Sequence, residues 1–283
     1  MHAARVLIVG ILASATCALS SAASGEPVRV LEDGGSFAVV GTDEFSLRID
    51  SSGAIGQVMV GETEWSWLIR LYTTPISFET GEGIRAVQGE GARGLGPVPE
   101  TIRPELRGDT CSIVIEREAA REEILGGAPM YHLTQTVTVH PTGRIGLRYE
   151  FEWLRFLQMR SAQVIIALRA APLDGCAWWA DFTSNVLHGT ISAEPDAKSL
   201  DEVKGALRSF TVDCGDADLS LWIADSGRVT AQRWNPQDYA FFVRVPHTGY
   251  GTEVYPGVRS VVDLDLLLPI PEMRSISRRT EPR

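Results

Sequence analysis

Apolar and polar side chains alternate with a period of two along most of this chain, and this rhythm constrains the fold more than any other feature. Phe45, Leu47 and Ile49 alternate with polar residues, and the segment 65–71 repeats the pattern. Successive side chains of a β-strand point to opposite faces, so strict alternation indicates a strand with one buried face. Further strand-like segments are 219–223, 239–245 and 261–269.

The clearest single unit is a hairpin over residues 131–153. Odd-numbered positions from Tyr131 to Val139 are mostly apolar, and Pro141-Thr142-Gly143 has the composition of a tight turn. The alternation then resumes from Ile145 to Trp153. We expect two long antiparallel strands with one apolar face, which are typical of a large sheet. By the same alternation, Trp65, Trp67 and Trp153 are expected in the core.

Few segments depart from this pattern. Residues 81–108 hold seven Gly and three Pro, which predicts a long loop or broken strands. Only 196–207 has a helical spacing, with Leu200, Val203 and Leu207 three and four residues apart. We therefore predict an all-β fold: a large antiparallel β-supersandwich in which twisted sheets pack face to face.

The N-terminus has the pattern of a secretory signal. Residues 1–23 contain Arg5, an apolar run from Val6 to Leu12, and the small residues 20–23. We expect cleavage after Ala23, a secreted or periplasmic protein, and no stable membrane span once the signal is removed. Residues 24–274 are then expected to form a single domain, and 275–283 a charged tail.

Three cysteines remain after this cleavage: Cys111, Cys176 and Cys214. An odd number permits at most one bridge within the chain. Because Cys176 and Cys214 flank the least regular segment, we favour that pair. Three free thiols are the alternative.

The charge balance excludes one class of partner. The chain has 36 acidic and 26 basic residues, a formal charge of −10, and its only lysines are Lys198 and Lys204. A general nucleic-acid binder needs a basic face, so no nucleic-acid partner is expected.

The motif GxGxxG occurs at 89–94, but prolines follow it where dinucleotide binding needs a helix. With no other motif of this kind, we expect neither a cofactor nor a metal.

Polar and aromatic residues gather in two irregular segments. The segment 246–257 holds His247, Tyr250, Glu253 and Tyr255 between turn residues, at the end of a strand, where binding sites are often built. These residues are one half of the predicted site.

The other half lies in 172–190, which contains Trp178, Trp179, Asp181 and His188. Sugar rings stack on aromatic faces, while carboxylates bind their hydroxyls. Adjacent tryptophans on a strand point to opposite faces, so one of the two is expected to be exposed.

A resemblance to a known superfamily follows from the order of these strands. The hairpin up to Phe151, the strand 162–170 after it, and Pro256-Gly257 before a last strand ending in Leu-Leu-Leu-Pro resemble galactose mutarotase-like supersandwich proteins over roughly 36–270. The resemblance implies aldose epimerisation, in which a His acid protonates the ring oxygen and a Glu base takes the anomeric proton. Glu253 resembles that Glu, and His188 is the counterpart of the acid.

Together these features predict a carbohydrate-binding or carbohydrate-processing protein with its cleft between 172–190 and 246–257. If it is an enzyme, Glu253 with His188 or His247 would transfer the proton. Two alternatives remain open at this point. One is a non-catalytic envelope or extracellular interaction module, and the other is a polysaccharide lyase-like enzyme with clustered Arg and Tyr.

Overall fold

The computed structural model describes residues 26–88, 95–215, 218–224 and 227–270. The proposed signal segment 1–23, the GxGxxG motif at 89–94 and the tail 275–283 lie outside these residues.

The described strands pair only in antiparallel fashion and form two layers. In the first layer, eight of the described strands pair in the order β1 (Arg29–Asp33), β2 (Phe37–Gly41), β3 (Phe45–Asp50), β4 (Ile55–Val60), β5 (Thr63–Pro75), β11 (Leu157–Arg169), β17 (Asp238–Arg244) and β16 (Arg228–Asn235). Short strands β6 (Ala86–Val87) and β18 (Thr252–Val254) pair with β5 and β11. The second layer runs β7 (Glu105–Arg107), β8 (Thr110–Arg121), β9 (Ile124–Val139), β10 (Arg144–Trp153), β19 (Arg259–Leu267), β15 (Asp218–Ile223), β14 (Lys204–Asp213), β12 (Ala177–Phe182) and β13 (Val186–Thr190).

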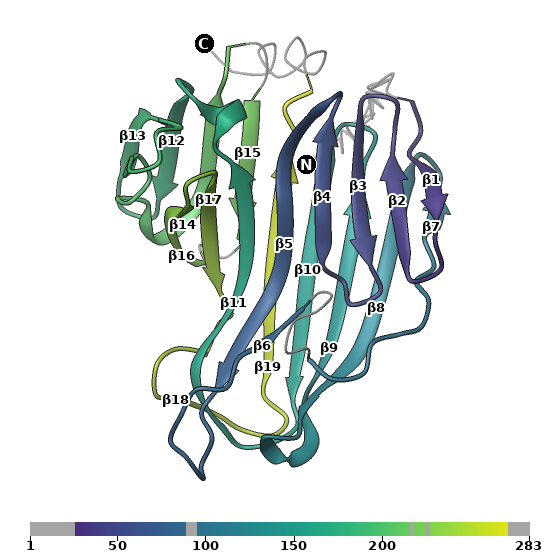
Figure 1. Ribbon diagram of the computed structural model, residues 1–283, viewed down its shortest axis with the longest axis vertical. Coiled ribbons are helices and arrows are strands. Elements are labelled where there is room, and N and C mark those ends of the chain that lie inside the picture. The colour runs from purple at the N-terminus through teal and green to yellow at the C-terminus, as the bar shows by residue number, and fades with distance from the viewer. Residues whose placement is uncertain (1–25, 89–94, 216–217, 225–226, 271–283) are drawn as a thin grey trace, which may run out of the picture.

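The layers lie face to face, with β2, β3 and β4 in front of β8, β9 and β10 (Figure 1). They are joined at one end by β14, because its first residues, Lys204–Ala206, pair with β16 of the first layer. Helix is almost absent from the described residues, where η1 (Ala171–Leu173) is a single 3-10 turn. The predicted all-β antiparallel supersandwich is confirmed.

The core forms where the inward faces of the two layers meet. In the predicted hairpin, β9 and β10 pair from Ile145↔Val139 to Trp153↔Tyr131, so the alternating apolar side chains share the inner face. Trp153 is fully buried and its indole Nε1 donates to Ser260 Oγ at 3.2 Å. The hairpin prediction and the core position of Trp153 are both confirmed.

A polar contact crosses this interior beside a tight turn. The buried amides of Gln88 and Gln135 join at 2.6 Å, and Gln135 Nε2 donates to the Gly53 carbonyl at 2.8 Å. Gly53 has φ +85°, and a Cβ there would lie 2.1 Å from Gln135 Oε1. The turn thus needs glycine both for its backbone and for the space beside it.

Two local predictions are wrong. Residues 196–207 are turns followed by the start of β14, not a helix. Leu200, Val203 and Leu207 are buried as expected, but apolar residues three and four apart also bury well from a turn that leads into a strand.

The core assignment of Trp67 also fails, because of a β-bulge. Neighbouring residues Ala167 and Leu168 of β11 pair with Leu68 and Ser66, which leaves Trp67 as the extra residue. Ser66 takes the buried position and its Oγ donates to the Ala167 carbonyl at 2.7 Å. Trp67 is thereby turned to the outer face of the layer.

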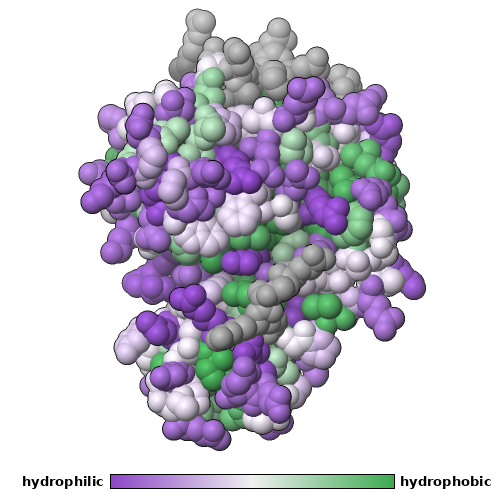
Figure 2. Space-filling view, in the orientation of Figure 1, coloured by the Kyte–Doolittle hydropathy of each residue, from purple (hydrophilic) through white to green (hydrophobic). Residues whose placement is uncertain are grey.

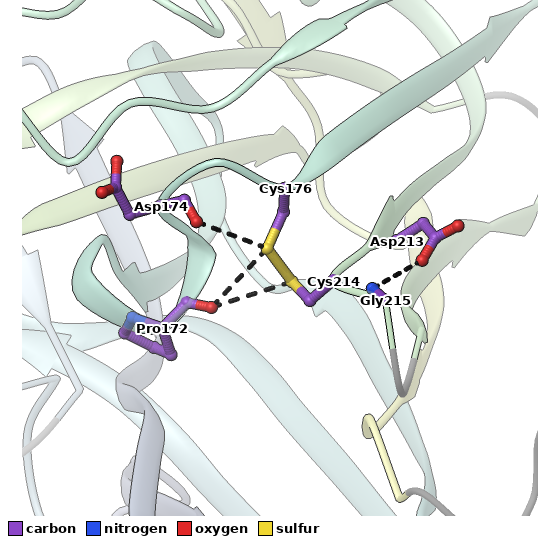
Figure 3. The surroundings of a disulfide bond; sticks show 6 residues. All are labelled: Pro172, Asp174, Cys176, Asp213, Cys214 and Gly215. Atoms are coloured by element: carbon purple, nitrogen blue, oxygen red, sulfur yellow. Dashed lines mark hydrogen bonds between the residues drawn. A yellow bond between two sulfur atoms is a disulfide. The ribbon is translucent and has the colours of Figure 1, made fainter.

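The favoured disulfide is present: Cys176 and Cys214 are bridged, and Cys111 is a buried free thiol. The bridge links the residue before β12 to the residue after β14, at the end of two paired strands. The Pro172 carbonyl oxygen lies 3.7 Å from both sulfurs (Figure 3).

Candidate functional site

The outer face of the first layer is built from cross-strand rows that the sheet register fixes. One row runs from Arg70 on β5 through Ile165 on β11 and Phe242 on β17 to Thr230 on β16 and Lys204 on β14. Phe242 points outward because its neighbours on β17 point into the core. Five strands from three regions of the sequence (63–75, 157–169 and 204–244) therefore contribute to one surface.

The next row brings two arginines together. Gln163 pairs with Arg244, and Val243 pairs with Val229. Continuing the second register by one residue places Arg228 beside Arg244. Neighbouring strands are about 4.8 Å apart, so these side chains share one patch of surface.

A hollow of about 550 Å³ lies over these two rows, and we call it the central hollow. It is lined by Gln163, Lys204, Gly205, Ala206, Arg228, Val229, Thr230, Gln232, Phe242 and Arg244. The lining combines an aromatic ring, two amides, a hydroxyl and three cations. These ten described residues include no carboxylate.

Two further hollows share residues with the central hollow and extend it. The loop hollow, about 390 Å³, is also lined by Arg228 and Arg244, and it includes His247. The turn hollow, about 480 Å³, shares Lys204 and includes Lys198. The three together form what we call the groove.

Partly exposed aromatic rings lead into the groove. Trp67 and Trp234 stack with ring centroids 5.7 Å apart, and Trp234 meets the edge of Phe242 at 6.3 Å. The Arg169 guanidinium lies 5.5 Å from the Trp67 ring. Figure 2 shows the side on which the first layer lies in front: it is mostly hydrophilic, with paler and green residues near the middle.

Arg70 adds a desolvated cation to the same face. Its Nε is buried without a hydrogen-bond partner among the described residues, and desolvation lowers the pKa of its guanidinium. Its register position, two strands from Phe242, places it beside the groove.

His247 is the one predicted catalytic residue that lines the groove. It is exposed and has φ +61°, in a loop fixed to β11 by its neighbour. Thr248 is buried, and its Oγ1 donates to the carbonyls of Val245 at 2.7 Å and Ala162 at 3.2 Å. The loop conformation is thus set by Thr248, which leaves His247 facing outward.

Glu253 has a different environment. It is exposed on β18 and accepts a hydrogen bond of 2.6 Å from Tyr255, which raises the pKa of that phenol. The Tyr255 ring also contacts Phe156, 5.2 Å between centroids. Tyr250 is 83% exposed. None of these four residues lines the groove.

The predicted residues of 172–190 lie on β12 and β13 of the second layer. Trp178 is 3% exposed and packs on Phe210, so it has no free ring face, whereas Trp179 is 42% exposed. This confirms that one of the two tryptophans is exposed. His188 lies opposite Trp179 on the edge strand β13, and Asp181 is half-buried on β12. The structure does not bring His188 into the groove with His247.

Sequence reasoning missed most of the groove. Phe242 and Arg244 are the outward positions of a segment recognised as a strand, and only the pairing of that strand shows what lies beside them. The scarcity of lysine was the one sequence feature that could have pointed to the groove, because the chain has only Lys198 and Lys204 and both line it.

The described residues contain no group of three or more His, Cys, Asp or Glu arranged to hold a metal ion. Nor do they contain a helix that is long and apolar enough to cross a membrane.

Comparison with known proteins identifies the fold. No family model and no curated protein matches this sequence. Among solved structures, a galactose mutarotase-like protein from Clostridium acetobutylicum superposes with a TM-score of 0.53 at 7% identity, covering 86% of this chain and 98% of that one. Galactose 1-epimerase from Lactobacillus acidophilus gives 0.52 at 7% identity, covering 85% and 97%. This chain has the galactose mutarotase-like fold.

Proposed function

We propose that this protein binds a carbohydrate in the groove on the outer face of the first layer. The central hollow supports this proposal, because it places the Phe242 ring among amide, hydroxyl and guanidinium groups. A sugar ring presents C–H faces to an aromatic ring and hydroxyls to polar side chains. One structure with the same fold is named a galactose 1-epimerase, which fits a sugar ligand.

The proposal concerns binding. Proton transfer at a sugar by the predicted pair needs an imidazole and a carboxylate within about 3 Å of one atom. His247 lines the groove, but Glu253 is hydrogen-bonded to Tyr255 outside it. A non-catalytic module is therefore the form of the proposal that the geometry favours.

The proposed setting is outside the cytoplasm. The signal-like residues 1–23 and the Cys176–Cys214 bridge both support export, since disulfides persist in oxidising compartments. N-terminal sequencing of the protein recovered from its producing cell tests this: a start at Ser24 supports export, and a start at Met1 contradicts it.

The binding experiment compares aromatic substitutions on three surfaces. A glycan array selects ligands, and calorimetry then measures affinity for Phe242→Ala and Trp234→Ala. Trp179→Ala tests the β12–β13 surface predicted from sequence, and Trp222→Ala is a matched control because Trp222 is exposed on β15 of the second layer.

Loss of one stacking face is expected to weaken binding by about tenfold in Phe242→Ala and Trp234→Ala, and to leave Trp179→Ala and Trp222→Ala unchanged. Weakening in Trp179→Ala alone would move the site to β12–β13. No saccharide binding by the unaltered protein would overturn the proposed function and leave a protein-interaction module.

A further inference from the structure

We infer that the saccharide held in the groove is anionic, with carboxylate or sulfate groups that pair with Lys204, Arg228 and Arg244. This inference rests on the proposed function and adds the class of ligand.

The first observation is where the positive charge lies. The chain has a formal charge of −10 and two lysines in its whole length. Both lysines line the groove, Lys198 in the turn hollow and Lys204 in both the turn and central hollows. An acidic protein thus gathers its scarce lysines with three arginines, Arg228, Arg233 and Arg244, on one concave surface.

The second observation is that these cations have no described counter-ion. Among the described residues outside the groove, seven arginines form ion pairs and others, such as Arg48, Arg160 and Arg208, do not; the paired ones are Arg29, Arg107, Arg121, Arg144, Arg148, Arg169 and Arg259. Among the described residues, no ion pair or hydrogen bond involves the side chain of Lys204, Arg228 or Arg244. Arg228 and Arg244 directly adjoin the cross-strand pair Val229–Val243 and line the same two hollows, and like charges this close across a sheet repel each other. A bound anion would offset that repulsion.

The second layer provides an internal comparison. Its outer face has a hollow of about 480 Å³ that also contains arginines. There Arg144 donates to both oxygens of Asp265 at 2.9 and 2.7 Å, and Arg148 donates to Asp263 at 2.7 Å. Two of the three arginines of this hollow, Arg144 and Arg148, are thus neutralised, and Arg208 has no ion pair among the described residues. In the central hollow, by contrast, none of the three cations has an ion pair among the described residues.

The chemistry of the cations matches oxyanions on a sugar. A guanidinium presents parallel N–H donors that fit a carboxylate or a sulfate, and Phe242 beside it can support the ring. Since the three hollows share residues, a ligand of more than one ring can follow the groove. The carboxylates of the groove, Asp196 and Asp201, line only the turn hollow. The anionic groups are therefore assigned to the central and loop hollows.

The test compares three sets of oligosaccharides of equal length by calorimetry: uronate-bearing, sulfated and neutral. Anionic saccharides are expected to bind at least about tenfold more tightly than neutral ones, with an affinity that falls between roughly 50 and 300 mM salt. Binding of the uronate set, the sulfated set or both supports the inference and identifies the source of the anion.

Substitutions locate the effect. Arg244→Gln and Arg228→Gln are each expected to weaken anionic binding by about fivefold to tenfold and to flatten its salt dependence. Arg148→Gln removes an arginine of the second layer and is expected to change neither. Unfolding curves confirm that each variant is folded.

The outcomes separate the two proposals. Tight, salt-independent binding of neutral saccharides would overturn the anionic ligand and leave the carbohydrate function standing. Anionic binding that is unchanged in Arg228→Gln and Arg244→Gln would also overturn the inference, because the anion would lie elsewhere. If no saccharide of any set binds, the proposed function itself fails.

Discussion

Removing the Cys176–Cys214 bridge is expected to cost a calculable amount of stability. The two cysteines are 38 residues apart in sequence. Cys176 precedes β12 and Cys214 follows β14, and these two strands already pair there through Ala177 and Asp213. Because this pairing remains without the bridge, the main effect is on the unfolded chain. Releasing a loop of this length raises the entropy of that chain by an amount worth about 4 kcal/mol in the chain-entropy description.

The assay is urea unfolding of the double variant Cys176→Ser/Cys214→Ser, followed by tryptophan fluorescence. The unfolding free energy is expected to fall by about 4 kcal/mol relative to the unaltered protein. Reductant should lower the unaltered protein to the same value and leave the double variant unchanged. A loss below about 1 kcal/mol would refute the reasoning, since it would mean that the bridge restricts the unfolded chain very little.

Three further predictions concern the interior. Gly53→Ala is expected to destabilise the protein by about 3 kcal/mol, because the added methyl group would meet the Gln135 amide. The control is Gly35→Ala, where φ is also positive but the space is open, and its expected cost is about 1 kcal/mol. Equal losses of unfolding free energy for the two variants in urea would contradict this. Burial raises the pKa of Tyr131 to about 12, above its ordinary value of about 10, so the unfolded chain loses this proton first. Stability should then hold below pH 10 and fall towards pH 12, and a urea midpoint that stays constant up to pH 11.5 would argue against it. Burial raises the pKa of the Cys111 thiol to about 11, so a thiol reagent at pH 8 is expected to modify Cys111 only after unfolding, and immediate reaction in the native protein would count against its burial.

The fold could be predicted because its main determinant is local. Alternation between apolar and polar residues gives each strand its buried face, and the turn at Pro141–Gly143 sets the register of the hairpin. Trp67 shows the limit of this reasoning. One bulge shifts the alternation, and it depends on how β5 pairs with β11, about a hundred residues later in the chain.

The groove could not be predicted for the same reason. Lys204, Arg228 and Arg244 come from three strands, and Gln163 comes from a fourth. Nothing in the local pattern of any one strand shows which outward side chain lies beside which. The segment around His247 was recognised because its polar residues are adjacent in sequence, which is the only kind of cluster that a single sequence displays.

The most direct test of the central claim is a crystal structure of the protein with a bound acidic oligosaccharide. The account predicts a sugar ring against Phe242, with its anionic group between Arg228 and Arg244. A saccharide bound instead at the β12–β13 edge, beside Trp179 and His188, would contradict it.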